Sequence, residues 1–242
     1  MIKKILSTLL VSSVLFVFAT ANSFAERPTF AIGLSAAYGG YVASGTELEG
    51  KNTPQDKTSA EESGEIGYTS LFIEASFLDR ITLGASWMAE DVTTGMTERT
   101  DSLCTAQATN NQGNPIPTCA LVGNEGTSSV KATFSNLVTG YVELNLWNGL
   151  YAKYGVMEMD LETKESLHTD SSYPNTTMDG ETYGLGWKGS WDNGVFIKTE
   201  TLMQNWSQIT LNGTGATDTD NNTSVTADLT GAIAQISLGK AF

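Results

Sequence analysis

The sequence predicts an all-β protein, a closed antiparallel up-and-down transmembrane β-barrel of eight strands. Three observations support this fold. Hydrophobicity alternates with a period of two from Phe30 to Asp160 and from Thr182 to Phe242, short turns alternate with long polar connections, and the last alternating segment runs to the end of the chain. A period of two is that of a strand with two different faces, so almost no helix is expected.

The first 25 residues are expected to be a secretory signal peptide, separate from the fold. Lys3 and Lys4 precede an apolar run from Ile5 to Ala19, and small residues up to Ala25 provide a cleavage site. The apolar run of about 15 residues is shorter than the roughly 20 that a spanning helix needs. Cleavage after Ala25 leaves residues 26–242, which are expected to form one domain, the barrel.

The first predicted strand shows how its two faces differ. Between Phe30 and Gly39 the even positions carry apolar side chains, whereas the odd positions are small and neutral. A soluble β-sandwich would place bulky polar groups on its second face, whereas a small barrel has a cramped interior. The barrel is therefore preferred. A soluble exported β-sandwich stays open as an alternative, and it would extract into aqueous buffer without detergent.

Tight turns and long polar connections divide the chain into hairpins. The tight turns are expected at 78–80, 147–149 and 192–194, which alternate with polar stretches over roughly 45–66, 93–129, 160–180 and 211–224. Short turns at one end and long loops at the other are typical of outer-membrane barrels. The eight strands are expected at about 28–44, 66–78, 80–92, 130–146, 150–159, 181–191, 195–209 and 225–242. An additional hairpin within 93–129, giving ten strands, stays open.

The turn at Asn148 and Gly149 allows the strand register to be predicted, because residues opposite each other in a hairpin share a face. A three-residue loop over 147–149 places Leu144 opposite Ala152 and Glu143 opposite Lys153. A two-residue turn would place Leu144 opposite Lys153 and mix the two faces. The same geometry predicts Phe77 opposite Ile81 at the first turn and Trp191 opposite Val195 at the third.

This register places charged residues of both signs on the inward face. They are Glu74, Glu90, Glu143, Lys153, Lys188, Lys198 and Glu200, and the aromatic residues Phe72, Tyr141, Tyr151 and Phe196 share that face. Each charge would cost about 2 to 4 kcal/mol if it faced lipid at the bilayer midplane. Eight strands enclose room for side chains only. We therefore expect a self-satisfying charge network that plugs the lumen, in preference to a transport pathway.

The last strand carries the most specific pattern, since Ile236 and Leu238 alternate with small residues before the chain stops at Phe242. In this the sequence resembles the small bacterial outer-membrane β-barrels typified by the OmpA membrane domain, OmpX and OmpW. The resemblance implies that Ile236, Leu238 and Phe242 form the signal for the barrel assembly machinery. It also implies location in the outer membrane, in contact with its lipid and lipopolysaccharide. Lys240 departs from the family pattern.

Charge and cysteine content are consistent with an exported protein. The formal net charge is −14, and loss of Lys3 and Lys4 with the signal peptide makes it −16, which excludes nucleic acid as a partner on charge grounds. Acidic loops bridged to lipopolysaccharide by divalent cations are one hypothesis that follows. Cys104 and Cys119 are expected to form a disulfide in an oxidising compartment. The sequence contains no motif for a cofactor or a metal, so none is expected.

Function is predicted less specifically than fold. We expect a protein that is not an enzyme, with a structural or surface-interaction role or a role in small-molecule passage. The alternative is a lipid A-modifying acyl hydrolase or acyltransferase, because some small barrels of this kind act on lipid A. His168 is the only imidazole available as a base, and it lies in a polar stretch expected to be a loop. The sequence leaves any substrate and the oligomeric state open.

Overall fold

The computed structural model describes residues 28–49, 56–78, 80–109, 112, 115–166, 172–214 and 224–242. The predicted cleavage site at Ala25 and the candidate base His168 lie outside these residues. Regular secondary structure in the described part is entirely β-strand. None of the described segments is a helix with the length and apolarity to cross a membrane.

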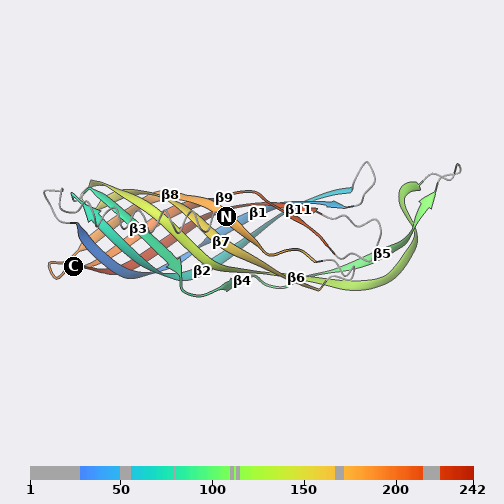
Figure 1. The fold of residues 1–242 in the computed structure, drawn as a ribbon, viewed down its shortest axis with the longest axis horizontal. Helices are drawn as coiled ribbons and strands as arrows, with labels where there is room; N and C mark the ends of the chain where they lie inside the picture. Colours follow the sequence, from blue (N-terminus) through green and yellow to red (C-terminus); the bar gives the residue numbers. More distant parts are fainter. Residues whose placement is uncertain are drawn as a thin grey trace.

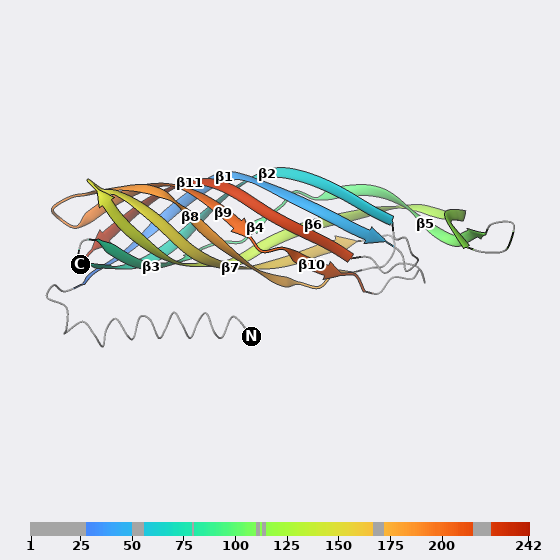
Figure 2. The ribbon, with the colours of Figure 1, turned by 90° about the horizontal axis from the view of Figure 1, so that it is seen from above.

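Eight of the strands close into a ring, which confirms the predicted barrel. The ring order is β1-β2-β3-β6-β7-β8-β9-β11, and β1 pairs again with β11 from Ala31 opposite Ala241 to Leu48 opposite Ser224. Figures 1 and 2 show these strands tilted around one long axis. Closure leaves no free edge in the ring and excludes the soluble sandwich. The strands are β1 (Thr29–Glu49), β2 (Asp56–Phe77), β3 (Ile81–Met88), β4 (Val92–Thr93), β5 (Thr97–Thr109), β6 (Pro115–Trp147), β7 (Leu150–Ser166), β8 (Thr176–Ser190), β9 (Val195–Trp206), β10 (Ile209–Asn212) and β11 (Ser224–Ala241).

The polar connections contain much more strand than predicted. β1 and β2 continue as a paired ribbon to Glu49 and Asp56. The stretch 93–129 does hold a hairpin, formed by β5 and the first part of β6. This hairpin extends beyond the end of the barrel (Figure 1), so it adds no strand to the ring, and the ten-strand alternative is wrong. Backbone pairing needs no apolar face, and therefore a polar sequence indicated exposure to water without indicating where the strands end.

The predicted register is confirmed at all three tight turns. Phe77 lies opposite Ile81, Glu143 lies opposite Lys153, and the Trp191 N–H donates to the Val195 carbonyl at 2.9 Å. At the second turn the predicted three-residue loop is wrong in detail. Asn148 and Gly149 form a two-residue turn with φ of 48° and 81°, and the extra residue is a bulge before Trp147. Asn and Gly tolerate positive φ, and the bulge preserves the register beyond it.

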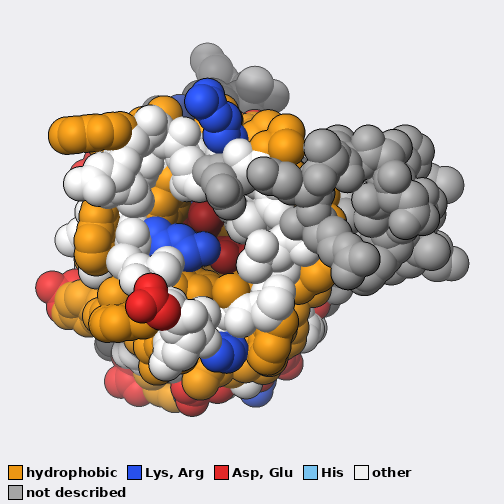
Figure 3. Space-filling model, turned by 90° about the vertical axis from the view of Figure 1, so that its left-hand side faces the viewer, with side chains coloured by type: hydrophobic (Ala, Val, Ile, Leu, Met, Phe, Trp, Pro, Cys, Tyr) orange, Lys and Arg blue, Asp and Glu red, His pale blue; other side chains and the backbone are white. Residues whose placement is uncertain are grey.

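The two faces of the wall differ as the alternation predicted. Outward side chains such as Leu34 and Leu238 are 59% exposed, whereas the inward Tyr151 is 0% exposed. Figure 3 shows apolar side chains around the outside of the barrel end and charged ones within it. Exposed aromatic residues lie on the outer wall at Phe30, Tyr38, Trp87, Tyr183, Trp191 and Phe242. An outer wall of this kind is stable against lipid and not against water.

Candidate functional site: the lumen charge network

Strand alternation brings five of the predicted charged residues into one layer of the lumen. Glu74 comes from β2, Glu143 from β6, Lys153 from β7, and Lys198 and Glu200 from β9. All five are buried. Each points inward because its strand neighbours on either side point to the outer wall. The ring therefore assembles, from four strands, a layer that no single hairpin contains.

Two lysines link three glutamates into one chain of ion pairs. The Lys198 ammonium donates to Oε1 of Glu74 and, at 2.6 Å, to Oε1 of Glu143. The Lys153 ammonium lies 2.9 Å from Glu200 Oε1 and 3.7 Å from Glu143 Oε1. Buried charges are tolerated when they are paired and hydrogen-bonded in this way.

Neutral side chains complete the network. The Tyr141 hydroxyl donates to Glu74 and the Tyr151 hydroxyl donates to Glu200, each at 2.8 Å, while Gln235 Nε2 donates to the second oxygen of Glu200 at 2.6 Å. Oε2 of Glu74 is a buried atom without a hydrogen-bond partner among the described residues. Apart from that oxygen, the charges satisfy one another, which is the arrangement expected of a plug.

The other two predicted members do not join this chain. Lys188 lies nearer the tight-turn end, where its ammonium is 4.2 Å from the centroid of the Phe196 ring. Glu90 is exposed and accepts a hydrogen bond from the Thr69 hydroxyl at 3.0 Å. Assigning Glu90 to the lumen network is wrong because β3 ends at Met88 and the chain bends at Glu90, so the alternation of faces no longer applies.

Inward aromatic residues lie over glycines on the adjacent strand, a feature that the sequence analysis missed. In each of six cross-strand pairs a Cβ on the glycine would come closer than 3.0 Å to the aromatic ring. The pairs are Tyr41–Gly231, Phe72–Gly33, Tyr141–Gly84, Tyr151–Gly186, Phe196–Gly239 and Trp206–Gly180. Once the register is known, an aromatic residue opposite a glycine is the signal that would have found them.

The lumen is filled by layers of different chemistry along its axis. On β9 the inward residues run from Phe196 through the charged Lys198 and Glu200 to Leu202 and Trp206. Near the tight turns, the centroids of the Phe72 and Phe196 rings lie 6.2 Å apart. On the far side of the charge layer, a buried apolar cluster comprises Leu137, Met157, Met159, Leu161, Met178 and Trp206. The apolar cluster was also missed, because its members come from four strands.

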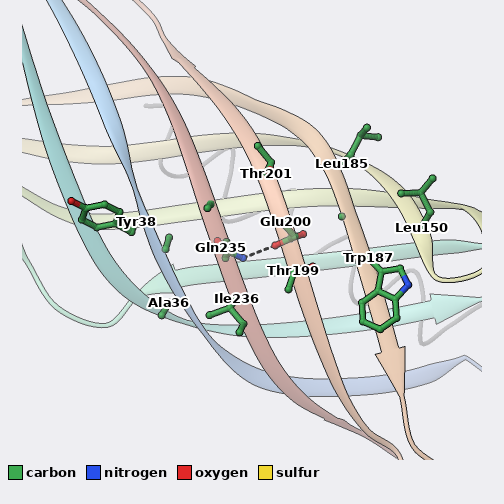
Figure 4. A pocket seen from close by; sticks show the side chains of 13 residues that line it. Ala36, Tyr38, Leu150, Leu185, Trp187, Thr199, Glu200, Thr201, Gln235 and Ile236 are labelled. Carbon is green, nitrogen blue, oxygen red and sulfur yellow. Dashed lines mark hydrogen bonds between the residues drawn. The ribbon is translucent and has the colours of Figure 1, made fainter.

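A groove of about 650 Å³ also crosses the outer wall over β1, β8, β9 and β11. Its rim includes Tyr38, Leu185 and Trp187, with Thr199 and Thr201 between them (Figure 4). The hydrogen bond between Gln235 and Glu200 lies at the same level of the wall. The apolar rim belongs to the outer face, so this groove is in contact with whatever surrounds the barrel, while Glu200 and Gln235 of the charge network lie at its base.

The predicted assembly signal lies where the ring closes. Ile236 and Leu238 are exposed on the outer wall, and the Phe242 N–H donates to the Phe30 carbonyl at 2.8 Å. The Lys240 ammonium donates to the carbonyl of Asn193. The last residues therefore help to close the barrel, whereas recognition by the assembly machinery stays a prediction.

The predicted disulfide has its two cysteines on paired strands. Cys104 in β5 is opposite Val122, and Cys119 in β6 is opposite Gln107. The two side chains lie outside the described part of the chain. We expect full-length protein, denatured without reductant, to migrate faster in electrophoresis than reduced protein, because a crosslink shortens the unfolded chain. Cys104→Ser should abolish the difference. Equal migration of oxidised and reduced wild-type protein would contradict the disulfide.

Closed topology, an apolar outer wall and a layer of buried ion pairs together define a small transmembrane β-barrel of the outer-membrane type. In the described residues no group of three or more His, Cys, Asp or Glu side chains is arranged to hold a metal ion. No family model and no curated protein matches the sequence.

Solved structures similar to this chain include three bacterial outer-membrane proteins. The outer membrane protein OprG from Pseudomonas aeruginosa is 9% identical, with 89% of this chain and 96% of that chain covered and a TM-score of 0.49. The outer membrane protease OmpT from Escherichia coli is 8% identical, with coverages of 88% and 97% and a TM-score of 0.45. For the outer membrane protein AlkL the identity is 12%, the coverages are 87% and 90%, and the TM-score is 0.41.

Proposed function

We propose that the protein is a non-enzymatic barrel of the bacterial outer membrane whose lumen is plugged and whose role is structural and at the cell surface. The observation that carries this proposal is the filling of the lumen by three successive layers. These are the aromatic pair Phe72 and Phe196, the charge network centred on Lys198, and the apolar cluster around Met157. Passage of a small molecule through the lumen would require all three layers to separate.

A surface role is supported by the part of the chain beyond the ring. The β5–β6 hairpin and the β1–β2 ribbon extend past the end opposite the tight turns (Figure 2). The ribbon carries exposed acids at Glu61, Glu62 and Glu65. We propose lipopolysaccharide as the neighbour of this region, bridged to its acids by divalent cations. Binding of the unfolded chain by the barrel assembly machinery is proposed from the terminal strand.

The alternative lipid A-modifying activity depends on His168, which lies outside the described residues. His168 is the one histidine of the sequence, so the described residues contain no imidazole to act as the base in acyl transfer. The proposal without an enzymatic activity is therefore the simpler one.

Liposome swelling tests the plugged lumen. Vesicles containing the folded protein are expected to swell in small sugars no faster than vesicles without protein, because the filled lumen leaves no water path. An open porin, reconstituted at the same ratio of protein to lipid, is the positive control, and heat-dependent electrophoretic mobility verifies that the barrel is folded. Sugar flux above the background of the empty vesicles would contradict the proposal.

A further inference from the structure

The barrel mouth at the tight-turn end contains a second candidate site, separate from the charge network. A cavity of about 540 Å³ opens there, bounded by the β2–β3, β6–β7 and β8–β9 turns. Figure 3 views this end and shows a basic side chain across the hollow with acidic side chains deeper within. Lys188 and Arg80 line the cavity, and among the described residues that line it there is no Asp or Glu. In a chain of net charge −14, such a lining is distinctive.

Lys188 is the less expected of these two cations, because it lies directly opposite Lys198 on the inward face. Like charges facing each other across two strands are destabilising unless each is compensated. Lys198 is compensated by Glu74 and Glu143 in the charge network. Lys188 is only partly buried and has no carboxylate within 4.0 Å in the described part of the chain. Its ammonium lies over the Phe196 ring, and Glu74 and Glu143 act on it only from a longer distance.

Arg80 provides the second positive charge. It occupies the turn between β2 and β3, and its side chain is exposed. Thr29 and Ser190 add hydroxyl groups to the lining. Two cations of different geometry with hydroxyl donors around them suit an oxygen-rich anion, since a guanidinium binds two oxygens at once and an ammonium donates to a third.

We propose that this mouth binds one small oxyanion, through a phosphate or a carboxylate group, between Lys188 and Arg80. The bound anion compensates the charge that Lys188 carries opposite Lys198. The cavity lies at the end of the barrel that the tight turns form (Figure 3), so the ligand is a solute of the compartment that these turns face. The proposal needs the folded barrel, but it does not depend on whether the rest of the lumen conducts solutes.

A competing arrangement uses only the protein. Oε2 of Glu74 has no hydrogen-bond partner among the described residues, and in this arrangement a rotated Lys188 side chain would pair with it. In that arrangement the mouth would lose half of its positive charge and would bind no anion. The two arrangements therefore predict opposite outcomes in a direct binding measurement.

Equilibrium dialysis of the folded full-length protein in detergent micelles against radiolabelled inorganic phosphate, at constant ionic strength, tests the proposal. We expect one saturable site per chain and competitive displacement by acetate. Lys188→Gln or Arg80→Gln should weaken phosphate binding by about tenfold or more, as expected for loss of a charge-assisted hydrogen bond. The double variant should show no saturable binding.

Lys240→Gln is the matched control for net charge. Lys240 lies at the same end of the barrel, but its ammonium is bound to the Asn193 carbonyl and it does not line the cavity. This variant should bind phosphate as the wild type does. Binding that does not saturate, or that falls equally in Lys188→Gln and Lys240→Gln, would overturn the site. Heat-dependent mobility of every variant ensures that lost binding is not lost folding.

Discussion

Replacing Lys198 by methionine is expected to lower the free energy of unfolding by about 3 to 5 kcal/mol, the largest loss among the charged residues. Methionine fills a similar volume but removes the one cation that contacts both Glu74 and Glu143. Both carboxylates are buried. Glu74 would lose the ammonium it is paired with, and Glu143 would keep only the longer 3.7 Å contact with Lys153. Breaking one side of a buried ion network costs this much because the remaining charges are uncompensated.

Urea unfolding of the protein in lipid vesicles, followed by heat-dependent mobility, measures this loss. Lys240→Met is the control, since Lys240 is outside the network and its loss should change the unfolding midpoint only slightly. Converting the orphaned acids as well, in Lys198→Met/Glu74→Gln/Glu143→Gln, should recover part of the stability because no unpaired charge remains. If Lys198→Met unfolds at the same urea concentration as Lys240→Met, the network does not stabilise the barrel as described.

Gly186→Val is the second change with a large expected effect, about 3 kcal/mol of destabilisation. A Cβ at Gly186 would come closer than 3.0 Å to the ring and the hydroxyl oxygen of Tyr151. Tyr151 is fully buried and donates to Glu200, so the ring has no free space and its displacement breaks that hydrogen bond. Overpacking and a lost hydrogen bond to a charged group each contribute about 1 to 3 kcal/mol.

Gly64→Val is the matched control because no atom lies within 4 Å of a Cβ at Gly64. Valine also suits a β-strand, so this variant should unfold at the wild-type midpoint or above it. Truncating the ring in Gly186→Val/Tyr151→Ala should relieve the clash, and the double variant should lose less stability than the two single variants summed. An unfolding midpoint for Gly186→Val equal to that of Gly64→Val would show that Tyr151 does not depend on the glycine.

The sequence by itself determined which face of the wall each strand residue occupies and the register of the hairpins at the three tight turns. The period of two separated Leu144 and Ala152, which face outward, from Glu143 and Lys153, which face inward. The hairpin register followed from the need to keep both faces intact, which at the second turn is met by a two-residue turn and a bulge in place of the predicted three-residue loop. Long polar stretches misled the prediction of strand ends, since paired backbone extends through them to Glu49 and into β5.

Only the tertiary structure decided which inward residues meet. Glu74 and Lys198 are 124 positions apart, and they pair because closure of the ring and the stagger of its strands bring them to the same height. The same stagger places Lys188 nearer to the tight-turn end of the barrel than the charge layer. The alternation along one strand carries no information on where a residue lies along the barrel axis relative to residues of distant strands. It therefore correctly indicated which face a side chain occupies and left its partners undetermined. Contacts between distant strands, and with them the layer of buried ion pairs and the basic lining of the mouth, exist only once the barrel closes.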